Sequence, residues 1–119
     1  MLIALPSAKP GDILQFAETA YDFGTIAESH EPVTHEFQFT NVSDEAVAVL
    51  SVSTGCGCTR PTYPTEPVAA GAKGVIRITF KPKGQVGQVN KDIKVRFRGA
   101  KAKSSKRITL RLRGTVTPG

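Results

Sequence analysis

Apolar and polar residues alternate with a period of two through most of the chain. The clearest case is the segment 33–41, VTHEFQFTN, where Phe37 and Phe39 fall on one face and polar residues fall on the other. Side chains alternate across a strand, so this pattern predicts a strand with one face in a core and one in water. The same alternation predicts strands over 76–81, 89–98 and 107–113.

Three further extended segments have shorter or less regular patterns. We expect a short first strand over 14–17 and a second extended piece over 21–26, where Gly24 permits a backbone conformation that other residues avoid. In the segment 46–53 the alternation slips by one residue, and an extra residue at Leu50–Ser51 would restore it. The slip therefore predicts a β-bulge at that point.

Short turn-forming sequences rich in Gly, Asn, Asp and Ser connect most of these segments. The exception is 59–67, TRPTYPTEP, whose three evenly spaced prolines cannot donate to a central strand ladder. We predict that it is an extended crossover over one end of the domain. About seven strands with turns about every 8–12 residues are typical of an antiparallel β-sandwich of immunoglobulin type. The pattern assigns residues 14–119 to this all-β domain and residues 1–13 to an N-terminal tail.

Length and hydropathy limit the alternatives. The 119 residues suffice for one domain around a single core. No apolar run approaches the roughly 20 residues that a membrane helix needs, so no membrane span is predicted. The apolar start, MLIAL, is shorter than the core of a signal peptide and has no basic segment before it. The chain is therefore either cytosolic or a mature segment that begins with a start Met.

The formal net charge of +6 conceals opposite charges in the two halves of the chain. Residues 1–59 hold one basic and eight acidic residues, a net charge of −7, whereas residues 60–119 hold fifteen basic and two acidic residues, a net charge of +13. Such a split suggests an electrostatic partner. In the simpler interpretation the fold interleaves the halves and the charges solvate its surface.

The basic residues of the last two predicted strands fall at alternate positions, on the face turned to water. If these strands are neighbours, their outward rows combine into one basic face made of Lys94, Arg96, Arg98, Arg107, Arg111 and Arg113. Such a face favours anionic partners. No aromatic residue interleaves with the cations, so stacking of nucleic-acid bases is not supported. Phosphate contact, an anionic glycan and an acidic protein surface, including the acidic half of another copy, fit equally well.

The CGC motif at Cys56 and Cys58 is the most distinctive local feature, and three interpretations remain open. A disulfide across one residue would close a small, strained ring of the kind that exchanges readily in redox chemistry. A thiolate pair also suits Cu(I) or Zn, but a structural zinc site has four ligands, and the other soft candidates are only His30, His35 and Met1. In the third interpretation the cysteines are small structural residues. No metal or cofactor site is therefore predicted.

The two histidines and the known catalytic motifs give little support to an enzyme. His35 shares its face with two phenylalanines, so we expect it to pack in the core with one ring nitrogen bonded to backbone. His30 lies in a polar turn and is expected to be solvated. The sequence contains no GxSxG or HExxH motif and no phosphate-binding glycine loop. It therefore does not predict an enzyme, apart from thiol exchange at Cys56 and Cys58.

Several motifs, taken in order along the chain, resemble a known family. They are YDFGTI at 21–26, VTHEFQFTN at 33–41, CGCT at 56–59, the residues YP and EPV within 63–68, and the glycines before the strand that ends at Phe80. Their order resembles the bacterial Ig-like domain-of-unknown-function family that is marked by a CGCT sequence and is common in Bacteroidetes. It is also similar to Hydin-type (ASH) and PapD-like/major sperm protein sandwiches.

This resemblance covers roughly residues 14–116. It implies a sandwich fold, no established activity, and export, often as a lipoprotein or as part of a larger surface protein. The relatives are mostly protein-binding or assembly modules. Two features depart from the family pattern: Gly55 stands where the family usually has Ser, and the strongly basic end is not a family hallmark.

These observations give one leading hypothesis and two alternatives. The leading hypothesis is a non-enzymatic, exported Ig-like module that binds another protein or associates with itself through opposed charged surfaces. The first alternative is a thiol redox or metal-handling protein that uses Cys56 and Cys58. The second alternative is a protein that binds a polyanion or nucleic acid through the basic face.

Overall fold

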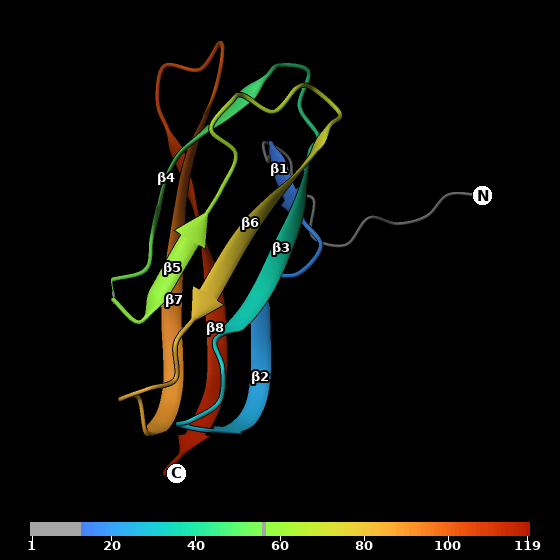
Figure 1. Cartoon of the computed structure of the whole chain (residues 1–119). Helices are drawn as coiled ribbons and strands as arrows, with labels where there is room; N and C mark the ends of the chain where they lie inside the picture. Colours follow the sequence, from blue (N-terminus) through green and yellow to red (C-terminus); the bar gives the residue numbers. More distant parts are fainter. Residues whose placement is uncertain (1–12, 56) are drawn as a thin grey trace, which may run out of the picture.

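The computed structural model describes residues 13–55 and 57–119. Two four-stranded sheets pack face to face, and the second sheet lies behind the first in Figure 1. The first sheet has the order β1 (Leu14–Phe16), β3 (Val33–Asn41), β6 (Lys73–Phe80) and β5 (Thr59–Thr62). The second sheet has the order β2 (Ala20–Ala27), β8 (Lys106–Thr117), β7 (Gly87–Gly99) and β4 (Val47–Ser53). Among the described residues there is no helix that could cross a membrane.

The all-β sandwich of immunoglobulin type is confirmed, and the alternating segments form its strands. The predicted bulge is confirmed as well. The pairing of β4 with β7 passes from Val49–Phe97 directly to Ser51–Arg96, which leaves Leu50 as the extra residue. Of the predicted tail, only Ile13 is among the described residues, and its carbonyl accepts a hydrogen bond from Val42 N at 3.0 Å.

The described residues form eight strands where about seven were expected, because β5 adds a strand to the seven extended segments that the pattern predicts. The first two of those segments belong to one stretch of chain that divides between the sheets. The chain pairs with β3 as β1, crosses between the sheets over residues 17–19, and then pairs with β8 as β2. The pair of β2 and β8 is parallel, so the sandwich is not antiparallel throughout. Only a tight hairpin forces two strands to be antiparallel, and these two strands are far apart in sequence.

The crossover predicted for residues 59–67 is wrong in its first half. Residues Thr59–Thr62 form β5, which pairs with β6 at the edge of the first sheet. Proline is tolerated in an edge strand because one side of that strand needs no ladder donor, so Pro61 does not break the pairing. Beyond β5 the chain crosses to the other sheet, where Val68 and Val47 exchange two backbone hydrogen bonds of 2.8 and 2.9 Å.

One apolar core fills the space between the sheets. It includes Phe37, Ile76, Phe80, Ile93 and Leu110, all of which are 0% exposed. The inward faces of β3, β6, β7 and β8 are therefore those that the alternation predicts.

His35 differs from the prediction of a core residue bonded to backbone. Its side chain is 18% exposed, its Nε2 contacts the carboxylate of Glu18, and its ring stacks on Tyr21 at a centroid distance of 3.7 Å. The reason is that β1 covers β3 only from Phe39 to Asn41, so His35 lies at an open margin within reach of Glu18. His30 is exposed, as expected, with Nδ1 at 2.6 Å from the carbonyl of Glu31.

The sequence Asp22-Phe23-Gly24, part of the family resemblance, serves the fold. Gly24 has φ of 80° and donates its backbone N–H to Asp22 Oδ1 at 2.8 Å, where the register of β2 shifts against β8. The shift turns Phe23 inward, where its ring stacks on Phe80 with centroids 5.3 Å apart. A side chain at Gly114 would collide with the Phe23 ring, so the glycine makes room for it.

Candidate binding surface

The outer face of the second sheet carries the predicted basic residues. Strands β7 and β8 are neighbours, as the prediction of a joint face requires. The register places Arg96 directly opposite Arg107, and Lys94 opposite Thr109. On the other side of β7, Arg98 lies opposite Ala48 of β4. We call Lys94, Arg96, Arg98 and Arg107 the cation cluster; all four are exposed.

The other two predicted cations lie farther along the same face, where carboxylates accompany them. Arg111 is opposite Asp92, with Arg111 Nε 3.7 Å from Asp92 Oδ1. Arg113 has Asp22 of β2 as its partner on one side and Asn90 of β7 on the other. The six cations therefore share one face but divide into a cluster of four and two residues with acidic neighbours.

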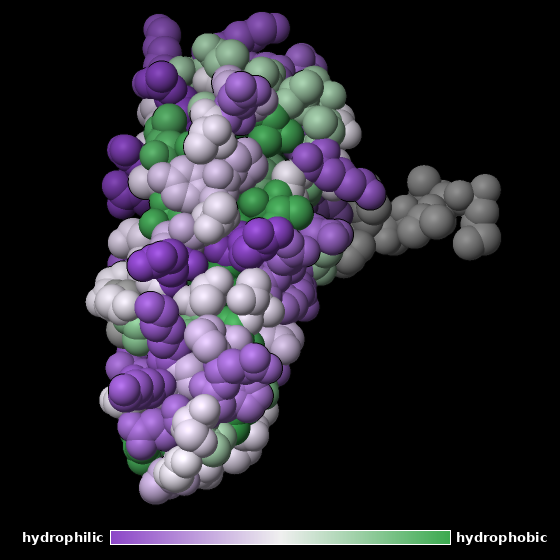
Figure 2. All heavy atoms as spheres, in the orientation of Figure 1, coloured by the Kyte–Doolittle hydropathy of each residue, from purple (hydrophilic) through white to green (hydrophobic). Residues whose placement is uncertain are grey.

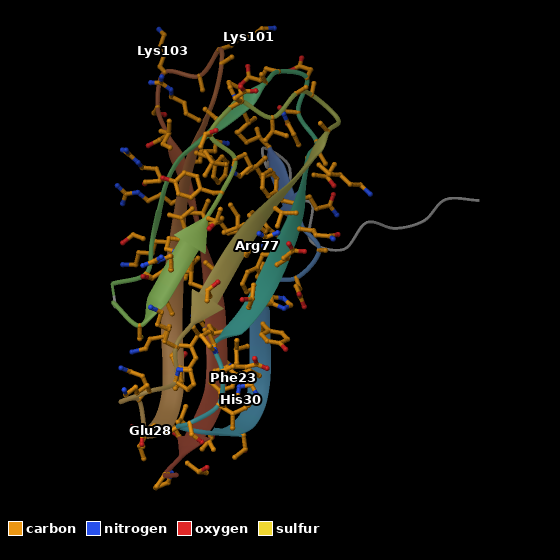
Figure 3. All side chains as sticks on the ribbon, in the orientation of Figure 1. Phe23, Glu28, His30, Arg77, Lys101 and Lys103 are labelled. Atoms are coloured by element: carbon orange, nitrogen blue, oxygen red, sulfur yellow. The ribbon has the colours of Figure 1, made fainter. Side chains whose placement is uncertain are left out.

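No carboxylate neutralises the cation cluster within the described residues. The three ion pairs found there join His35 to Glu18, Arg77 to Glu36, and Arg111 to Asp92. Because like charges directly opposite each other in a sheet are destabilising, Arg96 and Arg107 repel one another in the isolated chain. The basic character continues beyond the strands, since Figure 3 shows Lys101 and Lys103 at the tip of the β7–β8 loop.

The base of this loop is held by groups from the acidic half of the chain. Ala100 N donates to Ala46 O at 2.9 Å, and Lys101 N donates to Glu45 Oε2 at 3.2 Å. A side chain at Gly99 would collide with the Glu45 carboxylate, which explains the glycine at the end of β7. Glu45 thus fixes the end of the strand that carries Lys94, Arg96 and Arg98.

A second set of bonds holds Glu45 itself. Asn41 is 0% exposed, and its Nδ2 donates to the carbonyls of Glu45 and Val68 at 2.7 and 2.9 Å. Its Oδ1 accepts hydrogen bonds from the backbone N and the hydroxyl of Ser43 at 3.0 and 2.6 Å. The buried amide therefore ties the end of β3, the start of β4 and the crossover together. The sequence pattern assigned Asn41 only to a turn-forming segment and did not predict its burial, although a polar residue at the end of an apolar row is a signal that could have been used.

Strand β4 borders the cation cluster and presents small residues beside it. Ala48, Ser51 and Ser53 are the register partners of Arg98, Arg96 and Lys94. β4 is also the edge strand of the second sheet. In Figure 2 the outer surface of the first sheet is a mixture of hydrophilic and hydrophobic residues, and hydrophilic residues line the margin where β7 and β4 lie.

The acidic residues of the first half that the structure describes do not gather on one matching surface. Five of them contact groups of the same chain: Glu18 with His35, Asp22 with Gly24 N, Glu28 with Gly84 N, Glu36 with Arg77, and Glu45 with Lys101 N. These contacts are distributed over both sheets and both ends of the molecule. The acidic residues of the first half are therefore spread among other groups of the fold, whereas the basic residues of the second half are concentrated on one face.

The cysteine motif lies between β4 and β5, at the opposite end of β4 from the loop base. Cys58 is disulfide-bonded and partly buried against the core, and its carbonyl accepts a hydrogen bond from Lys81 N at 2.8 Å. Cys56 lies outside the described residues, so its predicted role is not tested. In the part of the chain that is described, no group of three or more His, Cys, Asp or Glu residues could hold a metal ion.

A family model matches nearly the whole length of this sandwich. Residues 14–116 match the family described as "Protein of unknown function (DUF1573)". The chain belongs to the DUF1573 family. No curated protein matches this DUF1573 chain.

Solved structures with the same fold include proteins of different kinds. The ASH/PapD-like domain 7 of human CEP192 matches with a TM-score of 0.71 and 16% identity, over 100% of this chain and 96% of that one. The YadV chaperone matches with a TM-score of 0.64 and 12% identity, over 88% of this chain and 52% of the chaperone. The VesB protease of Vibrio cholerae matches with a TM-score of 0.70 and 16% identity, over 90% of this chain.

The DUF1573 chain spans only 33% of VesB, and about half of the chaperone. At these identities the likeness establishes the β-sandwich fold and no more.

Proposed function

We propose that this DUF1573 protein is a non-enzymatic, exported module that binds an acidic surface of another protein through the cation cluster. The observation that carries the proposal is the placement of Arg96 directly opposite Arg107, with Lys94 and Arg98 beside them and no neutralising ion pair among the described residues. Such an arrangement lowers the stability of the free domain. Residues that reduce stability are commonly kept for a function, here the binding of an anionic partner.

Two of the solved structures with this fold are in keeping with a binding or assembly role. A PapD-like domain and a chaperone share this sandwich, and the first of them is almost the same length as the DUF1573 chain. Export is supported by the disulfide at Cys58, since disulfides persist mainly in oxidising compartments outside the cytosol.

A partner other than a second copy fits the charges best. A self-associating surface of opposed charge would need a coherent acidic patch, yet Glu18, Glu28, Glu36 and Glu45 each contact groups of their own chain. Breaking those contacts would offset the gain from pairing with the cation cluster of another copy. We therefore place the acidic groups on a different protein.

A comparison of two equally charged variants tests the proposal. Arg96→Glu/Arg107→Glu reverses the cation cluster, whereas Arg60→Glu/Lys83→Glu makes the same change in net charge at exposed positions away from it. Each is used, beside the wild-type chain, to capture cross-linked proteins from the cells that produce it. We expect a protein partner that the wild type and the control capture and the cluster variant loses. A partner that all three chains capture equally, or capture of no protein by the wild type, would refute the proposal.

A thiol redox role is the second candidate, because Cys58 is disulfide-bonded and lies near the end of a loop. Strained disulfides are the more easily reduced ones, so a redox protein should be reduced by a glutathione buffer of cytosolic composition. Mass spectrometry after alkylation measures the fraction reduced. A bond that survives this buffer in the folded chain contradicts the redox role and leaves the disulfide as a structural link.

A further inference from the structure

The cations of β7 occur at every second residue, which gives the cluster a regular spacing. Lys94, Arg96 and Arg98 all point from the same face of one strand. Side chains at alternate positions of a strand are about 7 Å apart, so the row from the first to the third cation spans about 13 Å. Alternate side chains of any other extended chain have this same spacing. The row therefore matches an extended peptide in register.

The side chains on the two sides of this cation row differ in size. On the β8 side, Arg107 and Thr109 are the register partners of Arg96 and Lys94. On the β4 side the partners are the small residues Ala48, Ser51 and Ser53. Apart from Leu50, the extra residue of the bulge, the side chains of β4 beside the row are small and leave the cations of β7 open to approach from β4. No further strand lies beyond β4 in the sheet.

Both ends of this approach are defined by the structure. Near one end, the backbone N–H and carbonyl of Val47 are already bonded to Val68, so only residues 48–53 of β4 remain beside the row. At the other end Asp92 lies two residues before Lys94, on the same face of β7, and is paired with Arg111. A carboxylate there repels any anion that extends past Lys94. The surface thus suits about three alternating negative groups.

We propose that the cation cluster binds an extended segment of a partner protein that carries carboxylates at alternate positions and lies over β4 against the cation row of β7. This inference rests on the proposed function and adds the chemistry and spacing of the partner. Arg96 and Arg107, side by side, hold the central carboxylate, and Lys94 and Arg98 hold the flanking ones. Guanidinium groups suit this task because their planar donors match a carboxylate.

A long polyanion fits the same surface less well. A duplex or polysaccharide that ran along β7 would meet the carboxylates of Asp92 and Asp22 on the outer face. The outward rows of β7 and β8 contain no aromatic residue that could stack on a base, so single-stranded nucleic acid gains nothing there beyond charge.

The test uses labelled peptides of about eight residues, long enough to span the row, and the full chain. One peptide alternates Glu and Thr, and the other has the same composition with all the Glu residues in one block. We expect the alternating peptide to bind at least about threefold more tightly, and its binding to weaken about tenfold between about 0.05 M and about 0.5 M salt, because exposed charges are screened. Arg96→Glu/Arg107→Glu should lower its affinity at least about tenfold, whereas Arg60→Glu/Lys83→Glu should leave it within about twofold.

The outcomes separate this inference from the proposed function. Equal binding of the two peptides, or tighter binding of a DNA duplex or heparin than of the alternating peptide, overturns the inference. If the cluster variant still loses a captured protein in that case, the proposed function stands without the alternating motif. If the alternating peptide binds as expected but no protein is captured, the inference about chemistry survives and the proposed function fails.

Discussion

Reversing one charge of the cation cluster should make the isolated domain more stable. Arg96 and Arg107 are directly opposite on β7 and β8. Two unit charges about 6 Å apart in a water-like dielectric repel by about 0.7 kcal/mol. Arg107→Glu replaces this repulsion by an attraction of similar size. Cross-strand pairs of opposite charge contribute about 0.2–1 kcal/mol once side-chain entropy is included. We therefore expect the free energy of unfolding to rise by about 0.5–1 kcal/mol.

Urea unfolding of the full chain at low and high salt measures this change. The gain should fall to a few tenths of a kcal/mol at about 1 M salt, where the screening length is about 3 Å. Arg107→Gln, which removes the repulsion and adds no attraction, should give about half of the gain. As a control, Arg60→Glu on β5 lies opposite Thr79 and should change stability little. A loss of stability in Arg107→Glu, or a gain that does not depend on salt, would refute the reasoning.

Three further predictions concern the framework that holds this surface. Gly114→Ala should destabilise the domain by about 1–3 kcal/mol because its methyl group collides with Phe23. In the double variant, Phe23→Leu should relieve much of this loss. Additive effects of the two substitutions, measured by urea unfolding in a double-mutant cycle, would contradict the collision. Asn41→Ala should cost about 2–4 kcal/mol in thermal unfolding, since it removes the four hydrogen bonds that this buried amide makes with Glu45, Val68 and Ser43. A loss under about 1 kcal/mol would mean that water replaces the amide. Phe37→Ala should cost roughly 3–5 kcal/mol by urea unfolding, because this ring is 0% exposed in the core; a loss below about 1 kcal/mol would reverse the assignment of the β3 faces.

Alternation carries most of the information about the fold in this sequence. A period of two identifies a strand and its inward face from neighbouring residues alone, and a one-residue slip identifies the bulge at Leu50. It could not identify β5, because proline is excluded from central strands but allowed at an edge, and only the sheet order shows which strand is at the edge. It also could not show that Glu18 reaches His35, since the contact depends on how far β1 covers β3.

The sequence could predict which cations lie on the candidate surface, but not which of them have acidic neighbours. The sequence places six cations on one face if β7 and β8 are neighbours, and they are. Their division depends on pairing registers: Asp92 opposes Arg111, and Asp22 reaches Arg113 only because β2 pairs in parallel with β8. A two-residue change in either register would keep every side chain on its face but give these carboxylates other partners. Strand periodicity alone contains no information on such registers.

The central claim is that the cation cluster is kept for binding at the expense of stability, and Arg107→Glu tests both parts in one chain. The measurement is the free energy of unfolding of this variant together with its capture of the protein partner, each relative to the wild type and to Arg60→Glu. The account predicts that stability rises by about 0.5–1 kcal/mol while capture falls, with neither changed in the control. Undiminished capture by a variant with raised stability would contradict it.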